Sequence, residues 1–216
     1  MNEFKTILEK TISAEIVEKK SRFIANLFYV ESAEDAENKI KEVKKKYYDA
    51  KHNCFAYLIY ENNKILKKFS DDGEPSGTAG APMLEILEKI GIYNVVIIVT
   101  RYFGGILLGT GGLVRAYSES LKKAISSATI LTQENGYEVD VECTYSNFEK
   151  FKYYCNKNNI NIINSTYSDT IICKIELNNE EKENLRKEIE DQNRLNILRF
   201  DIIRQKNVSK LSNKVD

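Results

Sequence analysis

Nine of the ten glycines of this 216-residue chain, and both of its prolines, lie between Gly73 and Gly112. Glycine is used where the backbone takes a positive φ or passes close to another atom. The clustering therefore predicts two loops of special backbone shape. Charged side chains of both signs accompany these glycines: Asp71, Asp72, Glu74, Arg101 and Arg115. We expect the two loops to form a binding site.

Charge and hydropathy narrow the function classes. The chain has 32 basic and 32 acidic residues, so no overall field directs it to nucleic acid or to an anionic membrane. Any nucleic-acid contact must come from a local patch. Neither a signal peptide nor an apolar run of membrane-spanning length is visible. We expect a cytoplasmic protein with no membrane partner.

The cysteines show no CxxC spacing, which in a chain of this size is typical of reduced, buried thiols. They are Cys54, Cys143, Cys155 and Cys173. His52, the only histidine, lies two positions before Cys54 on one face of a predicted strand, so a nucleophilic pair is conceivable. No third group orients the pair, and the favoured interpretation is a packed thiol beside a hydrogen-bonded histidine.

The first 130 residues are predicted to contain both strands and helices. Hydrophobic periodicity and turn signals place its elements. In order, they are two strands within residues 11–30 that turn at Lys19–Ser21, a helix from the cap Ser32 to about Tyr47, a hairpin of His52–Tyr60 with Ile65–Ser70, a helix that starts at Pro82 and ends before Gly91, a strand at Asn94–Thr100 and a helix from about Leu113. The apolar run Asn94–Thr100 predicts a strand buried on both faces.

A second domain follows a predicted linker at Leu131–Gly136. The expected order is strand, helix, strand, strand, helix, strand within residues 137–204, which matches the ferredoxin-like β-α-β-β-α-β arrangement. Residues 205–216 are polar and aperiodic, and we expect a polar tail there. The overall fold class is therefore α+β, with domains at residues 1–132 and 137–204.

The segment from Arg101 to Arg115 leads from the buried strand through a glycine loop into a helix. Free N–H groups at such a helix start make an anion pocket, and arginines add bidentate contacts to phosphate or carboxylate. The spacing fits neither a Walker A loop nor a dinucleotide fingerprint. The alternative is a tight loop whose arginines neutralise the facing carboxylates. The candidate binding residues are Asp71, Asp72, Glu74, Ser76, Thr78, Arg101, Tyr102, Gly104, Gly105, Gly111, Gly112 and Arg115.

Three carboxylates stand within four residues at Asp71, Asp72 and Glu74. Such a group suits a hard metal such as magnesium and metal-assisted hydrolysis. It equally suits capping of the following helix or pairing with Arg101. The lysine-rich second half of the first helix complements the helix dipole and is a weak nucleic-acid patch.

Several segments resemble the signatures of the IMPACT/YigZ family, over about residues 5–130. They are Lys20–Phe23, His52–Ala56, Asp71–Gly80, Val99–Gly105 and Leu108–Tyr117. Residues 137–204 fit the smaller C-terminal domain of the bacterial members. The resemblance implies an N-terminal domain with the second-domain fold of a small-subunit ribosomal protein. It also implies a C-terminal domain similar to the last domain of elongation factor G.

The resemblance implies a function in translation. Eukaryotic relatives regulate translation through protein contacts with a partner of an initiation-factor kinase, and nucleic-acid binding has been suggested for bacterial members. It carries over no catalytic residues, and we expect neither a metal site nor a cofactor. We therefore expect a binding and regulatory protein that contacts RNA, the ribosome or a translation factor through the glycine loops. The alternative is a metal-assisted hydrolase or phosphoryl-transfer enzyme that uses Asp71, Asp72 and Glu74.

Overall fold

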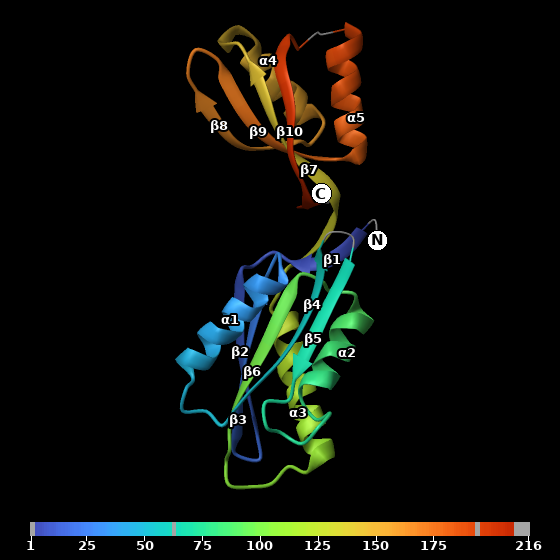
Figure 1. Ribbon diagram of the computed structural model, residues 1–216. Coiled ribbons are helices and arrows are strands. Elements are labelled where there is room, and N and C mark those ends of the chain that lie inside the picture. Colours follow the sequence, from blue (N-terminus) through green and yellow to red (C-terminus); the bar gives the residue numbers. More distant parts are fainter. Residues whose placement is uncertain (1–2, 62–63, 193–194, 210–216) are drawn as a thin grey trace. The chain divides into compact units, whose positions relative to one another are not determined.

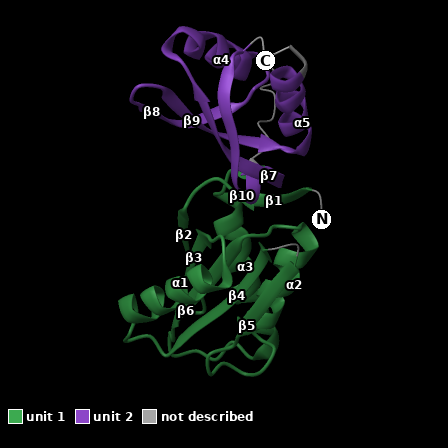
Figure 2. Cartoon of the chain, turned by 45° about the horizontal axis from the view of Figure 1, so that its top comes forward, with its two compact units in different colours: residues 1, 3–131 green, residues 2, 132–216 purple. Residues whose placement is uncertain are grey.

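The computed structural model describes residues 3–61, 64–192 and 195–209. The chain divides into two compact units, shown in Figure 2. The N-terminal unit comprises residues 3–131 and the C-terminal unit begins at Thr132. Each has its own hydrophobic core, so the fold class is α+β with two units, as the sequence predicts.

A five-stranded antiparallel sheet forms the centre of the N-terminal unit (Figure 1). In spatial order its strands are β2 (Thr11–Glu18), β3 (Ser21–Tyr29), β6 (Val95–Tyr102), β4 (His52–Glu61) and β5 (Lys64–Ser70). Strand β6 lies in the middle and is buried along seven of its eight residues. The predicted burial on both faces is therefore confirmed.

Helices cover both faces of this sheet. Helix α1 (Ala33–Lys46) packs Ala36, Ile40 and Val43 on one face. Helices α2 (Gly80–Ile90) and α3 (Thr110–Ser126) pack on the other face and build the larger core around Phe23. The short strand β1 (Glu3–Ile7) bridges in parallel to Ile92. The result is a three-layer α/β/α unit.

Local signals set most boundaries. Lys19 and Lys20 adopt φ of 44° and 65°, which makes the tight turn between β2 and β3. Ser32 accepts a hydrogen bond from the Asp35 N–H and caps α1, and Gly91 ends α2 with φ of 72°. Pro82 is the third helical residue rather than the first, because α2 begins at Gly80. The hairpin turn residues 62–63 lie outside the described residues.

The C-terminal unit has a four-stranded core in the order β10-β7-β9-β8, with antiparallel neighbours. Its elements along the chain are β7 (Ile130–Cys143), α4 (Tyr145–Lys157), β8 (Asn161–Tyr167), β9 (Ile171–Asn178), α5 (Asn179–Lys187), a π-helical turn (Glu188–Gln192) and β10 (Ile197–Ser209). This is the predicted ferredoxin-like order.

Two boundaries differ from the prediction. The segment expected to be a linker is the start of β7, which is already paired with β10 at Gln133. Gly136 allows the β7 backbone to pass close to the neighbouring strand β9, since a Cβ at this position would lie 2.5 Å from the Leu177 carbonyl oxygen. Strand β10 continues through Ser209, so residues 205–209 of the expected tail are paired. Residues 210–216 lie outside the described residues.

The described cysteines, which are all four of the chain, are buried and unpaired. Among residues 3–61, 64–192 and 195–209, no helix is both long and apolar enough to cross a membrane.

Candidate functional site

The carboxylate of Asp71 organises the first glycine loop. Its Oδ1 accepts hydrogen bonds from the N–H groups of Ala79 and Gly80 at 3.0 and 2.8 Å, and its Oδ2 accepts one from Gly77 at 2.8 Å. Asp71 therefore satisfies N–H groups at the start of α2 that no helical carbonyl reaches. This early cap explains why α2 begins before Pro82.

Asp72 fastens the same loop to α1 and β4. Its carboxylate accepts hydrogen bonds from the Lys44 ammonium at 2.6 Å and the Asn53 N–H at 2.7 Å. Its carbonyl oxygen lies 2.9 Å from His52 Nδ1. Because a carbonyl only accepts, Nδ1 carries the proton of this histidine. Asp72 itself takes a φ of 42°.

Glu74 lies inside the unit and bridges the two loops. Its Oε1 accepts hydrogen bonds from Arg101 Nη1 at 2.7 Å and from the Tyr117 hydroxyl at 2.8 Å. The Cys54 thiol lies 3.3 Å from that hydroxyl and 3.0 Å from the Asp71 carbonyl oxygen. Glu74 is only 8% exposed and Arg101 6%. We call Cys54, Glu74, Arg101 and Tyr117 the buried polar network.

Aromatic rings enclose the guanidinium of Arg101. Its Cζ lies 5.5 Å from the centre of the Phe23 ring and 5.6 Å from that of Phe103, distances suited to cation–π attraction. Its Nη2 donates weakly, at 3.5 Å, to Ser21 Oγ, and its buried Nε has no hydrogen-bond partner among the described residues. The side chain therefore anchors β6 internally and does not face solvent.

Two members of the buried polar network, Cys54 and Tyr117, hold their protons. Burial raises the pKa of the Cys54 thiol to about 12. Burial also raises the pKa of Tyr117, and its contacts with Cys54 and Glu74 add to that shift. At neutral pH, Cys54 is therefore a thiol and not a nucleophile. The structure confirms the interpretation of a packed Cys54 beside a hydrogen-bonded His52.

We expect Cys54 to resist alkylation in the folded protein. With a pKa near 12 against the ordinary value of 9.0, its thiolate fraction at pH 8 falls about a thousand-fold. The measurement is iodoacetamide labelling at pH 8 with and without urea, followed by peptide mass spectrometry. Equal labelling rates of Cys54 in the two conditions would contradict this assignment.

The second glycine loop is held against the β2–β3 turn. The Gly104 N–H donates to Ser21 Oγ at 3.2 Å, and a Cβ on Gly104 would lie 2.0 Å from the Lys20 carbonyl carbon. Gly105 and Gly109 adopt φ of 86° and 71°, which glycine takes without strain. The loop shape thus depends on glycine at these positions.

Helix α3 starts without a side-chain cap. Gly109 is its N-cap residue and offers no side chain, and the first helical hydrogen bond is from the Leu113 N–H to the Gly109 carbonyl. The preceding N–H groups, which belong to Thr110, Gly111 and Gly112, have no intrahelical acceptor. These donors form the positive end of the helix dipole.

The surface around this helix start combines positive charge and apolar side chains. Leu107 is 82% exposed, and Phe103 and Ile106 are also exposed. Arg115, Lys19 and Lys20 are exposed and form no ion pair with any described residue. Figure 1 shows the β2–β3 turn, the loop before α3 and the start of α3 at one end of the N-terminal unit. We call this surface, made of Lys19, Lys20, Phe103–Leu107, the first turn of α3 and Arg115, the loop end.

The other candidates separate into internal and exposed residues. Thr78 is buried and donates to the Pro75 carbonyl at 2.6 Å. Tyr102 donates to Asp49 at 2.7 Å. Ser76 is exposed. The structure thus brings Arg101 to Glu74 but not Arg115 to any of the three carboxylates.

The three carboxylates do not converge on a common point. Asp71 faces backbone N–H groups, Asp72 faces Lys44 and Asn53, and Glu74 faces Arg101 and Tyr117. In the part of the chain that the structure describes, no three His, Cys, Asp or Glu side chains are arranged to hold a metal. This donor arrangement favours helix capping and ion pairing over metal-assisted hydrolysis.

Sequence reasoning overlooked Tyr117 and Ser21. Tyr117 lies on the buried face of α3, where its ring contacts Phe23 and its hydroxyl donates to Glu74. A tyrosine on an otherwise apolar face was the available signal, because a buried tyrosine hydroxyl requires a partner. Ser21 lies in the predicted turn and in the family segment Lys20–Phe23, but neither indicates its contacts with Arg101 and Gly104.

The open face of the sheet in the C-terminal unit is occupied by its own ion pairs. Glu138 accepts from Lys174 at 2.9 Å and from Arg204 at 3.0 Å, and these hydrogen bonds lower the pKa of Glu138. Lys206 pairs with Glu176 on the same face. Charges neutralised in this way leave little net attraction for a polyanion.

Comparisons with known proteins agree with this two-unit architecture. Residues 19–125 match the Impact N-terminal domain, and residues 141–192 match a domain of unknown function, DUF1949. A crystal structure of a hypothetical protein is 30% identical, with a TM-score of 0.64, over 94% of this chain and 98% of that one.

Two bacterial relatives share much of the sequence. IMPACT family member YvyE of Bacillus subtilis is 48% identical over 120 residues, or 56% of this chain and 55% of the relative. The aligned part of the chain thus spans little more than half of that relative. IMPACT family member YigZ of Escherichia coli is 36% identical over 160 residues, or 74% of this chain and 78% of the relative.

Proposed function

The chain belongs to the IMPACT family, and on that premise we propose that it is a cytoplasmic, translation-associated regulatory protein that acts by binding ribosomal RNA through its loop end. The family resemblance supports the link to translation. The surface chemistry of the loop end supports RNA as the partner.

One observation carries the choice of RNA. Asp71, Asp72 and Glu74 are each engaged by donors of their own unit. Lys19, Lys20 and Arg115 have no ion pair among the described residues, and the exposed Glu18 beside Lys19 offsets only one of these three positive charges. The loop end therefore has local positive charge in a chain with equal numbers of acidic and basic residues. Phosphate groups are attracted to such a patch.

Two further features fit a nucleic acid. The free N–H groups at the start of α3 suit phosphate oxygens. The half-exposed ring of Phe103 suits stacking of an unpaired base, which is worth about 1–3 kcal/mol. Phe103 also contacts the internal Arg101, so its ring is held in place before binding. Such preorganisation reduces the entropy lost on association.

The test compares Arg115→Gln with Lys122→Gln, both on α3. Lys122 is exposed and already paired with Glu119, so it is a matched neutral substitution away from the loop end. Binding to purified ribosomes and to protein-free ribosomal RNA is measured across a salt series. We expect Arg115→Gln to lower the slope of log affinity against log salt by about 1 and to weaken binding. We expect Lys122→Gln to leave both unchanged.

Either of two results would contradict this proposal. One is unaltered RNA affinity in Arg115→Gln and in the double variant Lys19→Gln/Lys20→Gln. The other is ribosome binding that needs ribosomal proteins and is absent with protein-free RNA. The second result would instead identify the loop end as a protein-docking surface built around Ile106 and Leu107.

A further inference from the structure

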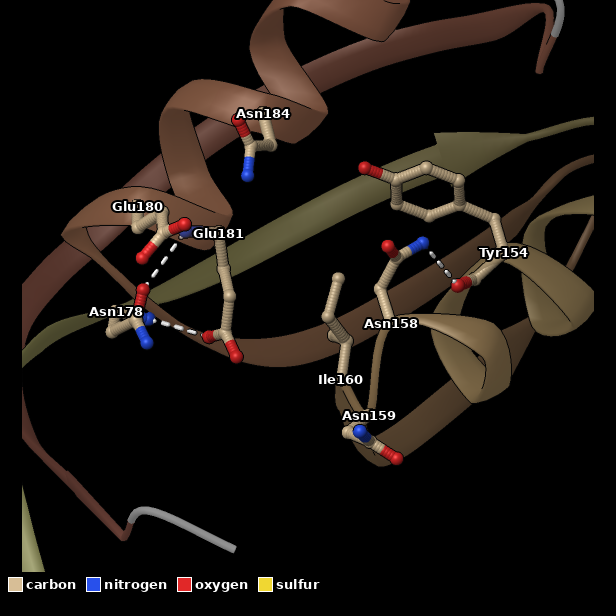
Figure 3. A pocket seen from close by; sticks show the side chains of 8 residues that line it. All are labelled: Tyr154, Asn158, Asn159, Ile160, Asn178, Glu180, Glu181 and Asn184. Carbon is tan, nitrogen blue, oxygen red and sulfur yellow. Dashed lines mark hydrogen bonds between the residues drawn. The ribbon is translucent and has the colours of Figure 1, made fainter. Parts of the chain in front are cut away.

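The C-terminal unit contains a polar pocket far in sequence from the loop end. The pocket has a volume of about 480 Å³ and lies between the end of α4 and the first turns of α5. Figure 3 shows the side chains that line it, namely Tyr154, Asn158, Asn159, Ile160, Asn178, Glu180, Glu181 and Asn184. No part of the proposed RNA contact involves these residues.

The hydrogen bonds in the pocket leave several acceptors unused. Asn178 and Glu181 form a capping box at the start of α5, in which Glu181 accepts from the Asn178 N–H at 2.8 Å and Asn178 accepts from the Glu181 N–H at 2.8 Å. Asn158 donates to the Tyr154 carbonyl at 2.8 Å. The amide oxygen of Asn158 and the second carboxylate oxygen of Glu181 accept no hydrogen bond from a described residue. They stand on opposite sides of the pocket in Figure 3.

The pocket has negative charge without a counterion. Neither Glu180 nor Glu181 forms an ion pair among the described residues, and none of the eight lining side chains is cationic. The C-terminal end of α4, which is the negative end of its dipole, reaches the pocket at Asn158. Burial raises the pKa of Glu181, and the neighbouring Glu134 and Glu180 raise it further. A bound cation would relieve this repulsion.

The apolar groups that line the pocket favour an organic cation over a metal ion. Ile160 is buried and contributes its side chain to the pocket wall, and the ring of Tyr154 forms another part of the lining (Figure 3). Methylene groups pack on such surfaces, and an ammonium is attracted to an aromatic face. A hard divalent metal instead prefers six or more oxygen ligands without apolar contact.

We propose that this pocket binds an alkylammonium group, with Glu181 and the Asn158 amide oxygen accepting its N–H donors and with Ile160 and Tyr154 contacting its methylenes. The group could belong to a free polyamine or to a lysine side chain of a protein. Both present the same chemistry to the pocket, and two probes distinguish them.

The experiment is a titration of the full chain with spermidine and, separately, with lysine blocked at its α-amino and carboxyl groups. The readout is the NMR shift of the side-chain amides of Asn158 and Asn184. We expect saturable shifts at millimolar ligand, and none with blocked lysine that is acetylated on its side chain. Saturation by spermidine alone would identify a polyamine site, and saturation by blocked lysine alone a peptide site.

The matched variants are Glu181→Gln and Glu183→Gln. Glutamine keeps the capping box because its amide oxygen accepts the same N–H, so Glu181→Gln preserves the fold. Glu183 is on the same helix and outside the pocket, where it pairs with Lys182. We expect about ten-fold weaker binding for Glu181→Gln and no change for Glu183→Gln.

Three results would overturn the proposal. They are the absence of amide shifts with either amine, equal affinity in Glu181→Gln and wild type, and shifts produced by magnesium in preference to both amines. Because these probes contain no RNA and these residues lie outside the loop end, failure here leaves the RNA proposal unaffected.

Discussion

Replacing Arg101 with methionine is expected to destabilise the N-terminal unit by about 3–5 kcal/mol, the usual cost of removing one partner of a buried ion pair. Methionine fills much of the arginine volume but provides no donor for Glu74. The Glu74 side chain, which is 3% exposed, would keep only the Tyr117 hydroxyl. The carboxylate must then be buried without a cation or become protonated.

Hydrogen exchange at the amides of β6 provides the measurement, since these core amides report the global opening of their own unit. The control is Lys67→Met, which removes an ion pair with Glu88 of similar length but with side chains 55% and 39% exposed. Such surface pairs contribute about 0–1 kcal/mol. If Arg101→Met lowers the stability of the unit no more than the control does, Glu74 is not held by Arg101.

A double variant separates the ion pair from the packing around it. Arg101→Met combined with Glu74→Met removes the unpaired charge and should recover part of the lost stability, because apolar replacement of a buried pair is often tolerated. Recovery should be incomplete, since the Tyr117 hydroxyl loses its acceptor.

The second large effect is expected for Gly104→Ala, which should lower the free energy of unfolding by about 3 kcal/mol. This value is the upper end of the range for inserting extra atoms into a packed region. The added Cβ would lie 2.0 Å from the Lys20 carbonyl carbon and 2.4 Å from the Ser21 nitrogen. Both are backbone atoms, so no side-chain rotation relieves the overlap. The loop must move away from the β2–β3 turn, and the hydrogen bond from the Gly104 N–H to Ser21 is then lost.

Gly111→Ala is the matched control because it lies in the same glycine-rich segment. A Cβ at Gly111 meets no atom within 4 Å, and the residue is in the first turn of α3. Alanine is favoured over glycine in helices by up to about 1 kcal/mol, so this variant should be neutral or slightly stabilised. Urea unfolding is compared for both variants, and equal stability of the two would contradict the close contact at Gly104.

Structural features that are set by residues close together along the chain could be predicted from the sequence. The turn at Lys19–Lys20, the Ser32 cap and the Gly91 stop are decided within a few positions along the chain. The buried strand β6 and the β-α-β-β-α-β order followed from hydrophobic periodicity. The family resemblance rested on the same local segments, and the match at residues 19–125 confirms it.

The meaning of Gly136 depended on its neighbours in space. Glycine near polar residues resembles a linker in sequence, yet at this position it permits the β7 backbone to pass the Leu177 carbonyl. The polar residues 205–209 resembled a tail, but pairing with β7 places them in a strand. Strand pairing supplies hydrogen bonds that local composition does not reveal.

The sequence by itself determined where the charged glycine loops are, and only the tertiary structure decided what each charge does. Arg101 and Tyr117 reach Glu74 from 27 and 43 positions away, so no local pattern could pair them. Arg101 and Arg115 look alike in sequence, but one lies under two aromatic rings and the other is exposed. The physical reason is desolvation: burial forces a charge to find an internal partner, whereas an exposed charge stays available to a ligand.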